Sequence, residues 1–108
     1  MENQSPFLAM RRLEGQLQSL LRMVDIDLLT SDEKRAVSTL RRLAADARLD
    51  TRDYELSETR QEQLTCAAAA QKRLEKLRRA ILAAGDAFGP ADVAQLGAQC
   101  SYIANLVR

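Results

Sequence analysis

One stretch of the chain limits the fold more than any other: the residues from Leu64 to Ala84 include no glycine or proline. Apolar residues return there every three or four positions, which places them on one face of an α-helix about 30 Å long. Gly85 follows, and glycine is typical of the residue that ends a helix. Another helix, from the same chain or from a second copy, must cover this face. The apolar positions are Ala67, Ala70, Leu74, Leu77, Ile81 and Ala84.

The other helix boundaries are marked by capping residues. Ser5–Pro6 supplies a capping hydroxyl and a first-turn proline for the first helix, and Pro90, with Phe88 before it as a hydrophobic staple, begins a last helix. Thr30 and Glu33 have the spacing of a capping box. We therefore expect an all-α, up-and-down four-helix bundle with helices at approximately 6–28, 31–49, 54–84 and 90–107.

The junction between the second and third helices is ambiguous, because no glycine or proline marks it. The two helices either break, with Asp53 or Ser57 as the new cap, or fuse into a rod of about fifty residues that would dimerise to cover its apolar face. Projecting the apolar positions of the second helix forward by sevens favours the break, because the projected residues are polar. They are Thr51, Glu58, Thr65 and Lys72.

Length and charge limit the classes of protein to which the chain can belong. The chain has 108 residues, enough for one domain over 1–108, and a formal net charge of +1, which predicts no strong attraction of the whole molecule to polyanions. Its longest apolar run, Cys66 to Ala70, is far too short to cross a membrane. Met1 to Pro6 does not resemble a secretory signal, so we expect a cytoplasmic location.

The residue types argue against an enzyme. The chain has no histidine, which removes the commonest general base and metal ligand. Cys66 and Cys100 are too few for a zinc site and, in an antiparallel pair of helices, about 12 Å apart along the axis. No segment has the glycine spacing of a phosphate-binding loop. We expect no catalytic residue, metal, cofactor or small-molecule substrate, and no motif is specific enough to indicate a family.

The third helix and the segment before it are the best candidates for an interaction surface. Acidic residues precede the alanine run and basic residues follow it, and the small alanine side chains let another helix approach closely. That helix belongs either to a second copy, giving a homodimer, or to the same chain. We expect a helical protein–protein interaction module: an adaptor, assembly factor or dimeric scaffold. Its candidate residues are Asp53, Tyr54, Glu58, Glu62, Ala67, Ala70, Arg73 and Lys76.

Three arginine doublets support a second hypothesis, a small nucleic-acid-binding regulatory protein. Basic residues from three helices neutralise phosphates if they align in one stripe. Aromatic residues, which make up 4% of the chain, are not interleaved with these arginines for stacking on bases, so solvated helix surfaces explain the doublets more simply. The doublets are Arg11, Arg12, Arg41, Arg42, Arg78 and Arg79.

Overall fold

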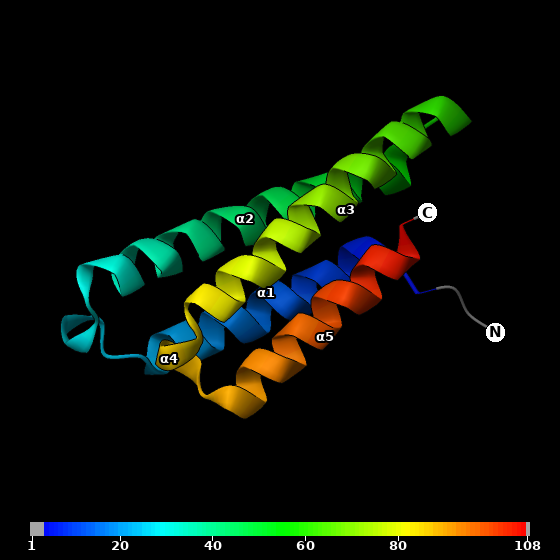
Figure 1. Ribbon diagram of the computed structural model, residues 1–108. Coiled ribbons are helices and arrows are strands. Elements are labelled where there is room, and N and C mark those ends of the chain that lie inside the picture. Colours follow the sequence, from blue (N-terminus) through cyan, green and yellow to red (C-terminus); the bar gives the residue numbers. More distant parts are fainter. Residues whose placement is uncertain (1–3, 108) are drawn as a thin grey trace.

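All four predicted helices are present in the computed structural model, which describes residues 4–107 except for the side chains of Asp86 and Ala87 (Figure 1). The all-α four-helix bundle is confirmed. Residues 1–3, part of the segment used above to judge a secretory signal, lie outside the described range. The elements are α1 Pro6–Met23, the short 3-10 helix η1 Ile26–Leu28, α2 Ser31–Leu56, α3 Arg60–Ala83, the short α4 Gly85–Phe88 and α5 Pro90–Leu106.

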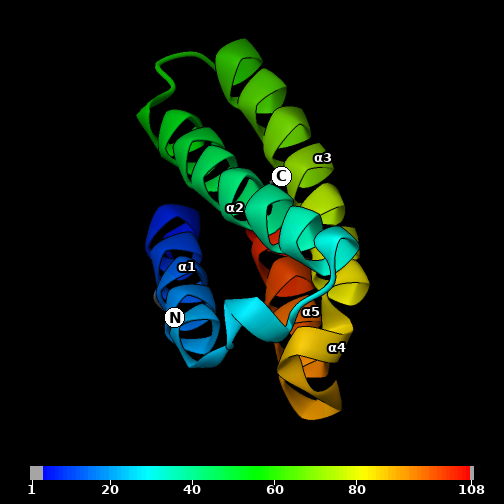
Figure 2. The same cartoon turned by 90° about the vertical axis from the view of Figure 1, so that its left-hand side faces the viewer.

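The four long helices form a closed ring of neighbours. α1 packs against α2, α2 against α3, α3 against α5, and α5 returns to α1 (Figures 1 and 2). Their apolar stripes meet in a central core, in which Met10, Leu40, Leu77 and Ile81 are fully buried. The molecule is elongated, 47 × 27 × 17 Å.

Three predicted helix starts are present with their caps. The Ser5 hydroxyl accepts a hydrogen bond from the Leu8 amide at 3.2 Å. The Thr30 hydroxyl accepts from the Glu33 amide at 3.1 Å, and the Glu33 carboxylate accepts from the Thr30 amide at 3.0 Å, which completes the capping box. Pro90 is the first residue of α5, and Gly89 before it has a φ of 102°, a conformation open mainly to glycine.

The predicted end of the first helix, residue 28, is wrong. α1 ends at Met23, and Asp25 then caps η1, because its carboxylate accepts a hydrogen bond from the Asp27 amide at 3.1 Å. This local bond stabilises a turn in place of a further helical turn.

The predicted junction of the second and third helices is also wrong in its position. α2 does not stop near residue 49 but continues to Leu56, and α3 begins at Arg60, not at residue 54. The helices do break, at residues 57–59, so the alternative of one fused rod is excluded. Thr51, whose polarity favoured an earlier break, is fully buried inside α2, where its hydroxyl donates to the Arg48 carbonyl at 2.9 Å.

The end of the third helix differs slightly from the expectation. α3 ends at Ala83 and Ala84 caps it, while Gly85 begins the short helix α4. Among the residues that the structure describes, only Gly89 has a positive φ.

α2 and α3 extend beyond the rest of the bundle. At 1.5 Å per residue, their 26 and 24 residues span about 39 and 36 Å, whereas the 18 residues of α1 and 17 of α5 span about 27 and 26 Å. The excess lies at the α2–α3 connection, which extends past the start of α1 and the end of α5 (Figures 1 and 2). We call residues 50–66 the hairpin tip.

Candidate functional site

The hairpin tip is acidic, unlike the chain as a whole. It carries five acidic and two basic residues, a net charge of −3 in a protein of net charge +1. Asp53, Glu55, Glu58 and Glu62 are all exposed. Several of these acids also have partners within the fold: Asp50 binds Arg73 of α3 at 3.2 Å, Glu55 accepts a hydrogen bond from the Ser5 hydroxyl at 2.6 Å, and Asp53 forms an ion pair with Arg52 at 3.3 Å.

The connection itself is held by side chains that cap both helix ends. Ser57 donates its hydroxyl to the Asp53 carbonyl at 2.8 Å, at the end of α2. Thr59 caps α3, because its hydroxyl accepts from the Glu62 amide at 3.1 Å. The Glu62 carboxylate in turn accepts from the Glu58 amide at 3.3 Å. These bonds give the connection between the two helices a defined shape.

The base of the tip is a small second core. Ala67, Ala70 and Val107 are buried together, with Tyr54 packed against them. Gln71 fixes the end of α5 there, because its side-chain amide donates to the Val107 carbonyl at 2.6 Å. The alanine face of α3 is therefore covered by residues of the same chain, and not by a second copy.

Two leucines of the tip are exposed, and one of them, Leu64, continues a helix face that is contacted by α5 lower in the bundle. Leu64 lies seven residues before Gln71, which bonds to α5, and is 49% exposed because α5 ends before reaching it. Leu56 lies seven residues, about two turns, after Leu49, which is itself 41% exposed, so Leu56 belongs to an outer face of α2. It is 69% exposed, beyond the start of α1.

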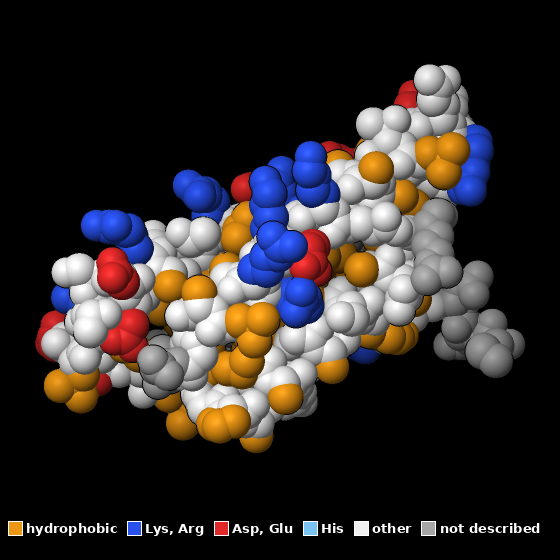
Figure 3. Space-filling view, in the orientation of Figure 1, with side chains coloured by type: hydrophobic (Ala, Val, Ile, Leu, Met, Phe, Trp, Pro, Cys, Tyr) orange, Lys and Arg blue, Asp and Glu red, His pale blue; other side chains and the backbone are white. Residues whose placement is uncertain are grey.

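These leucines are the site residues that sequence reasoning missed. Leu64 begins the apolar pattern of α3, whereas Leu56 stands among polar residues where the apolar pattern is weak. Only the unequal lengths of the four helices show that neither α1 nor α5 extends along the tip. Figure 3 shows apolar side chains exposed on one face of the tip.

A shallow hollow crosses the tip between the end of α2 and the start of α3. Its volume is about 640 Å³. Its wall combines one exposed leucine with hydroxyl, amide and carboxylate groups, which can hydrogen-bond to a partner at the edge of an apolar contact. The lining residues are Asp53, Leu56, Ser57, Thr59, Gln61, Glu62, Thr65 and Cys66.

The predicted interaction residues therefore divide into three groups. Asp53, Glu58 and Glu62 lie together on the exposed tip. Tyr54, Ala67 and Ala70 form its base. Arg73 and Lys76 lie further along α3, where Arg73 binds Asp46 at 3.6 Å and Asp50 at 3.2 Å, and Lys76 is exposed.

The structure does not bring the six arginines of the doublets into one groove. Arg12 lines a hollow between α1 and α5, Arg41 lines one between α1 and α2, and Arg78 lines one between α3 and α5. Arg78 and Arg79 both bind Glu75, at 2.7 and 3.2 Å. Arg11 lies over the Phe7 ring, 5.9 Å from its centre, and Arg42 is exposed on α2.

The two cysteines are both free thiols. Burial raises the pKa of Cys100 to about 12, which keeps its thiol protonated. Cys66 is half-buried at the tip, with the Ser57 hydroxyl 3.6 Å from its sulfur. Within residues 4–107, no group of three acidic, cysteine or histidine side chains is placed to hold a metal ion.

A comparison of the chain with known protein families, with curated proteins and with solved structures found no match. Of the helices formed by the described residues, none is both long and apolar enough to cross a membrane.

Proposed function

We propose that this chain is a non-enzymatic protein–protein interaction module, an adaptor or assembly scaffold of the cytoplasm, that binds its partner through the hairpin tip. One observation carries the proposal. Leu56 and Leu64 are exposed in a region that no other helix of the described residues covers, and Leu64 continues a face of α3 that α5 contacts lower in the bundle. A helix of a partner, or of a second copy, that lies beside the tip completes the bundle there and buries both side chains.

The acidic residues around these leucines support the same proposal. A typical protein interface has an apolar centre and a polar rim. Asp53, Glu58 and Glu62 lie on the tip near Leu56 and supply such a rim. Their charge favours a partner with basic residues beside its apolar contact, and it speeds the encounter of the two proteins at low salt.

The test uses the tagged protein as bait in a nuclease-treated native lysate. It compares the wild type with one double and one single serine variant. Leu56→Ser with Leu64→Ser removes the apolar contacts of the tip. Leu82→Ser is the matched control, because Leu82 is also exposed, at 57%, but lies near the other end of α3. Thermal unfolding shows whether each variant is folded.

We expect specific proteins to copurify with the wild type and with Leu82→Ser but to be lost, about tenfold or more, with the tip variant. Sedimentation of the purified protein, alone, shows whether a second copy is the partner: a dimer that the tip variant abolishes identifies self-association. Equal capture by all three proteins, with an unchanged sedimentation profile, contradicts the proposal.

A second candidate is the binding of nucleic acid by exposed basic residues. Figure 3 shows Lys and Arg side chains gathered over α2 and α3, and Lys72, Lys76 and Arg79 are exposed on α3. Binding to labelled duplex or single strands that weakens steeply between about 50 and 200 mM salt favours this alternative. The absence of any affinity at the lower salt concentration removes it.

A further inference from the structure

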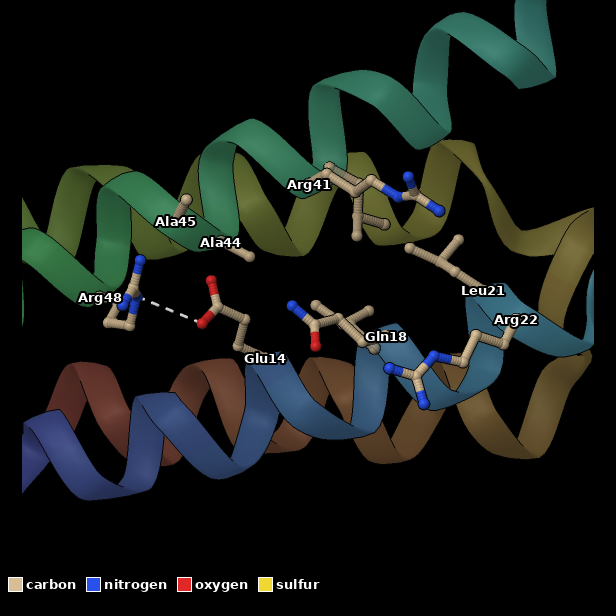
Figure 4. A pocket seen from close by; sticks show the side chains of 10 residues that line it. Glu14, Gln18, Leu21, Arg22, Arg41, Ala44, Ala45 and Arg48 are labelled. Carbon is tan, nitrogen blue, oxygen red and sulfur yellow. Dashed lines mark ion pairs between the residues drawn. The ribbon is translucent and has the colours of Figure 1, made fainter.

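The groove between α1 and α2 offers little apolar surface to a partner (Figure 4). It has a volume of about 640 Å³, but the core residues Leu17, Leu21 and Leu40 at its floor are at most 3% exposed. An ion pair between Arg48 and Glu14, at 3.2 Å, spans one end. Exposed apolar side chains lie instead on the outer side of α2.

α2 and α3 pack side by side, and each turns a row of exposed side chains away from the core. On α2, Arg42, Leu49 and Leu56 are seven residues apart, so they lie along one side of the helix. Leu49 is 41% exposed and Leu56 is 69% exposed. We call this row, with the matching row of α3, the α2–α3 face. The exposed residues of the α3 row, three or four positions apart, are Ala69, Lys72, Lys76 and Arg79.

The α2–α3 face is basic at one end and acidic at the other. The ion pair between Asp46 and Arg73, at 3.6 Å, shows which residues of the two antiparallel helices are level. Arg42 and Lys76 lie one turn from this pair, on the side away from the hairpin tip, and Figure 3 shows Lys and Arg side chains gathered over α2 and α3. The acidic end, at the tip, carries Asp53, Glu58 and Glu62, all exposed.

The charges at the two ends are available to a partner. Asp53 pairs with Arg52 at 3.3 Å, but both are exposed, and such surface pairs are weak. The other four have no ion pair with any residue from 4 to 107. They are Arg42, Glu58, Glu62 and Lys76.

A second copy of the chain, turned end for end, matches this pattern. In a two-fold dimer the same face of both copies is in contact. When the copies are antiparallel, the acidic end of each covers the basic end of the other. At 1.5 Å per residue, the midpoint between the two ends falls close to Leu49 of α2 and Ala69 of α3. Leu49 therefore meets its own counterpart at the two-fold axis, and Leu56 lies over the apolar stem of Arg42.

The α2–α3 face is large enough for such a dimer. Centred on Leu49, two antiparallel copies overlap for about 30 Å, and two helices side by side are about 20 Å wide. Each copy then contributes about 600 Å², and both together about 1,200 Å², within the range of specific interfaces. Leucines and alanines form the centre of the contact and charged residues form its two ends, as is typical of protein interfaces.

We propose that this chain forms an antiparallel homodimer through the α2–α3 face, with the hairpin tip of each copy on Arg42 and Lys76 of the other. The inference deepens the proposed function and rests on it, because it names a second copy as the partner of the acidic tip. It also extends the contact beyond the tip, to Leu49 and to the basic end of the face.

Charge reversal tests the arrangement by sedimentation at about 50 mM salt. Arg42→Glu with Lys76→Glu makes both ends of the face acidic, and Asp53→Lys with Glu58→Lys makes both ends basic. Glu62 stays unchanged, because its carboxylate holds the start of α3. We expect each variant alone to dimerise about tenfold more weakly or worse. An equal mixture of the two forms a dimer of unlike chains, because opposite charges meet again at both ends.

Two further variants separate the face from charge in general. Leu49→Glu places two carboxylates together at the two-fold axis, and we expect it to be monomeric. Arg11→Glu with Arg12→Glu changes the net charge as much as the acidic variant does, but on exposed positions of α1, outside the face. We expect its dimerisation to change by less than about twofold. Thermal unfolding shows that each variant is folded.

Several results overturn the inference: a monomeric wild type, a dimer unchanged by Leu49→Glu, equal losses in the α1 control and the acidic variant, or no dimer in the mixture. Leu64→Ser separates the inference from the proposed function, because Leu64 lies on the α5 side of α3, outside the face. We expect this variant to dimerise normally. If the wild type is monomeric but captures a protein through Leu56 and Leu64, the inference fails and the proposed function stands.

Discussion

Two glycines of this chain are expected to respond in opposite ways to the same substitution. Gly15 lies inside α1, and a Cβ added there meets no atom within 4 Å. Gly89 also has space, but its φ of 102° strains any residue that has a side chain. We expect Gly15→Ala to raise the free energy of unfolding by about 0.5–1 kcal/mol, and Gly89→Ala to lower it by about 1 kcal/mol or more.

Urea denaturation of the two variants beside the wild type measures both changes. Each variant controls for the other, because both add one methyl group at a position with free space. A loss of stability in Gly15→Ala shows that the α1–α5 side is packed more tightly at Gly15 than the structure indicates. Unchanged stability in Gly89→Ala shows that the backbone there relaxes to a negative φ.

Thr51 shows how a single side chain misleads a reading of the sequence. A polar residue at a position projected to be in the core predicts a break in the helix. The Thr51 hydroxyl instead donates to the carbonyl of Arg48, one turn earlier, so the side chain is buried with its polar group satisfied. Hydrophobic spacing contains no information about this local bond.

Among the elements, the helix starts are much easier to predict than the helix ends. Thr30 and Glu33 form a capping box at the expected place. The true start of α3 has the same spacing, Thr59 and Glu62, but Asp53 and Ser57 are equally good caps in isolation. The ends of α1 and α2 have no glycine signal, and local bonds of Asp25 and Ser57 decide them.

The capping box at the start of α2 makes stability depend on pH. Hydrogen bonds from the Thr30 amide and hydroxyl lower the pKa of Glu33, so the folded state favours the carboxylate. A lowered folded pKa means that this stabilisation is present above the unfolded pKa and is lost as the pH falls through the folded pKa.

Glu33→Gln tests this expectation by urea denaturation at several pH values. We expect the variant to be less stable than the wild type at neutral pH, with a difference that shrinks as the pH falls below about 4. Asp27→Asn is the matched control, because its exposed side chain makes no hydrogen bond to another described residue. A difference that stays constant with pH contradicts a role for the Glu33 charge.

At the scale of the whole molecule, the apolar pattern predicted the bundle and its order of helices but not its candidate site. Periodicity identifies which residues of a helix face a neighbour. It does not show whether that neighbour is long enough to cover them, as with Leu64 beyond the end of α5. The cluster of acidic residues before α3 is visible in the sequence, whereas the groove between α1 and α2 requires two helices to be placed side by side.

The most direct test of the central claim, that a partner completes the bundle at the hairpin tip, is amide hydrogen exchange of the protein alone and bound to the protein that it captures. Backbone amides at uncovered helix ends exchange quickly, because the hydrogen bonds there open easily. We predict slower exchange in the complex at residues 53–66 and unchanged exchange around Leu82. Protection elsewhere, with exchange at residues 53–66 unchanged, contradicts the claim.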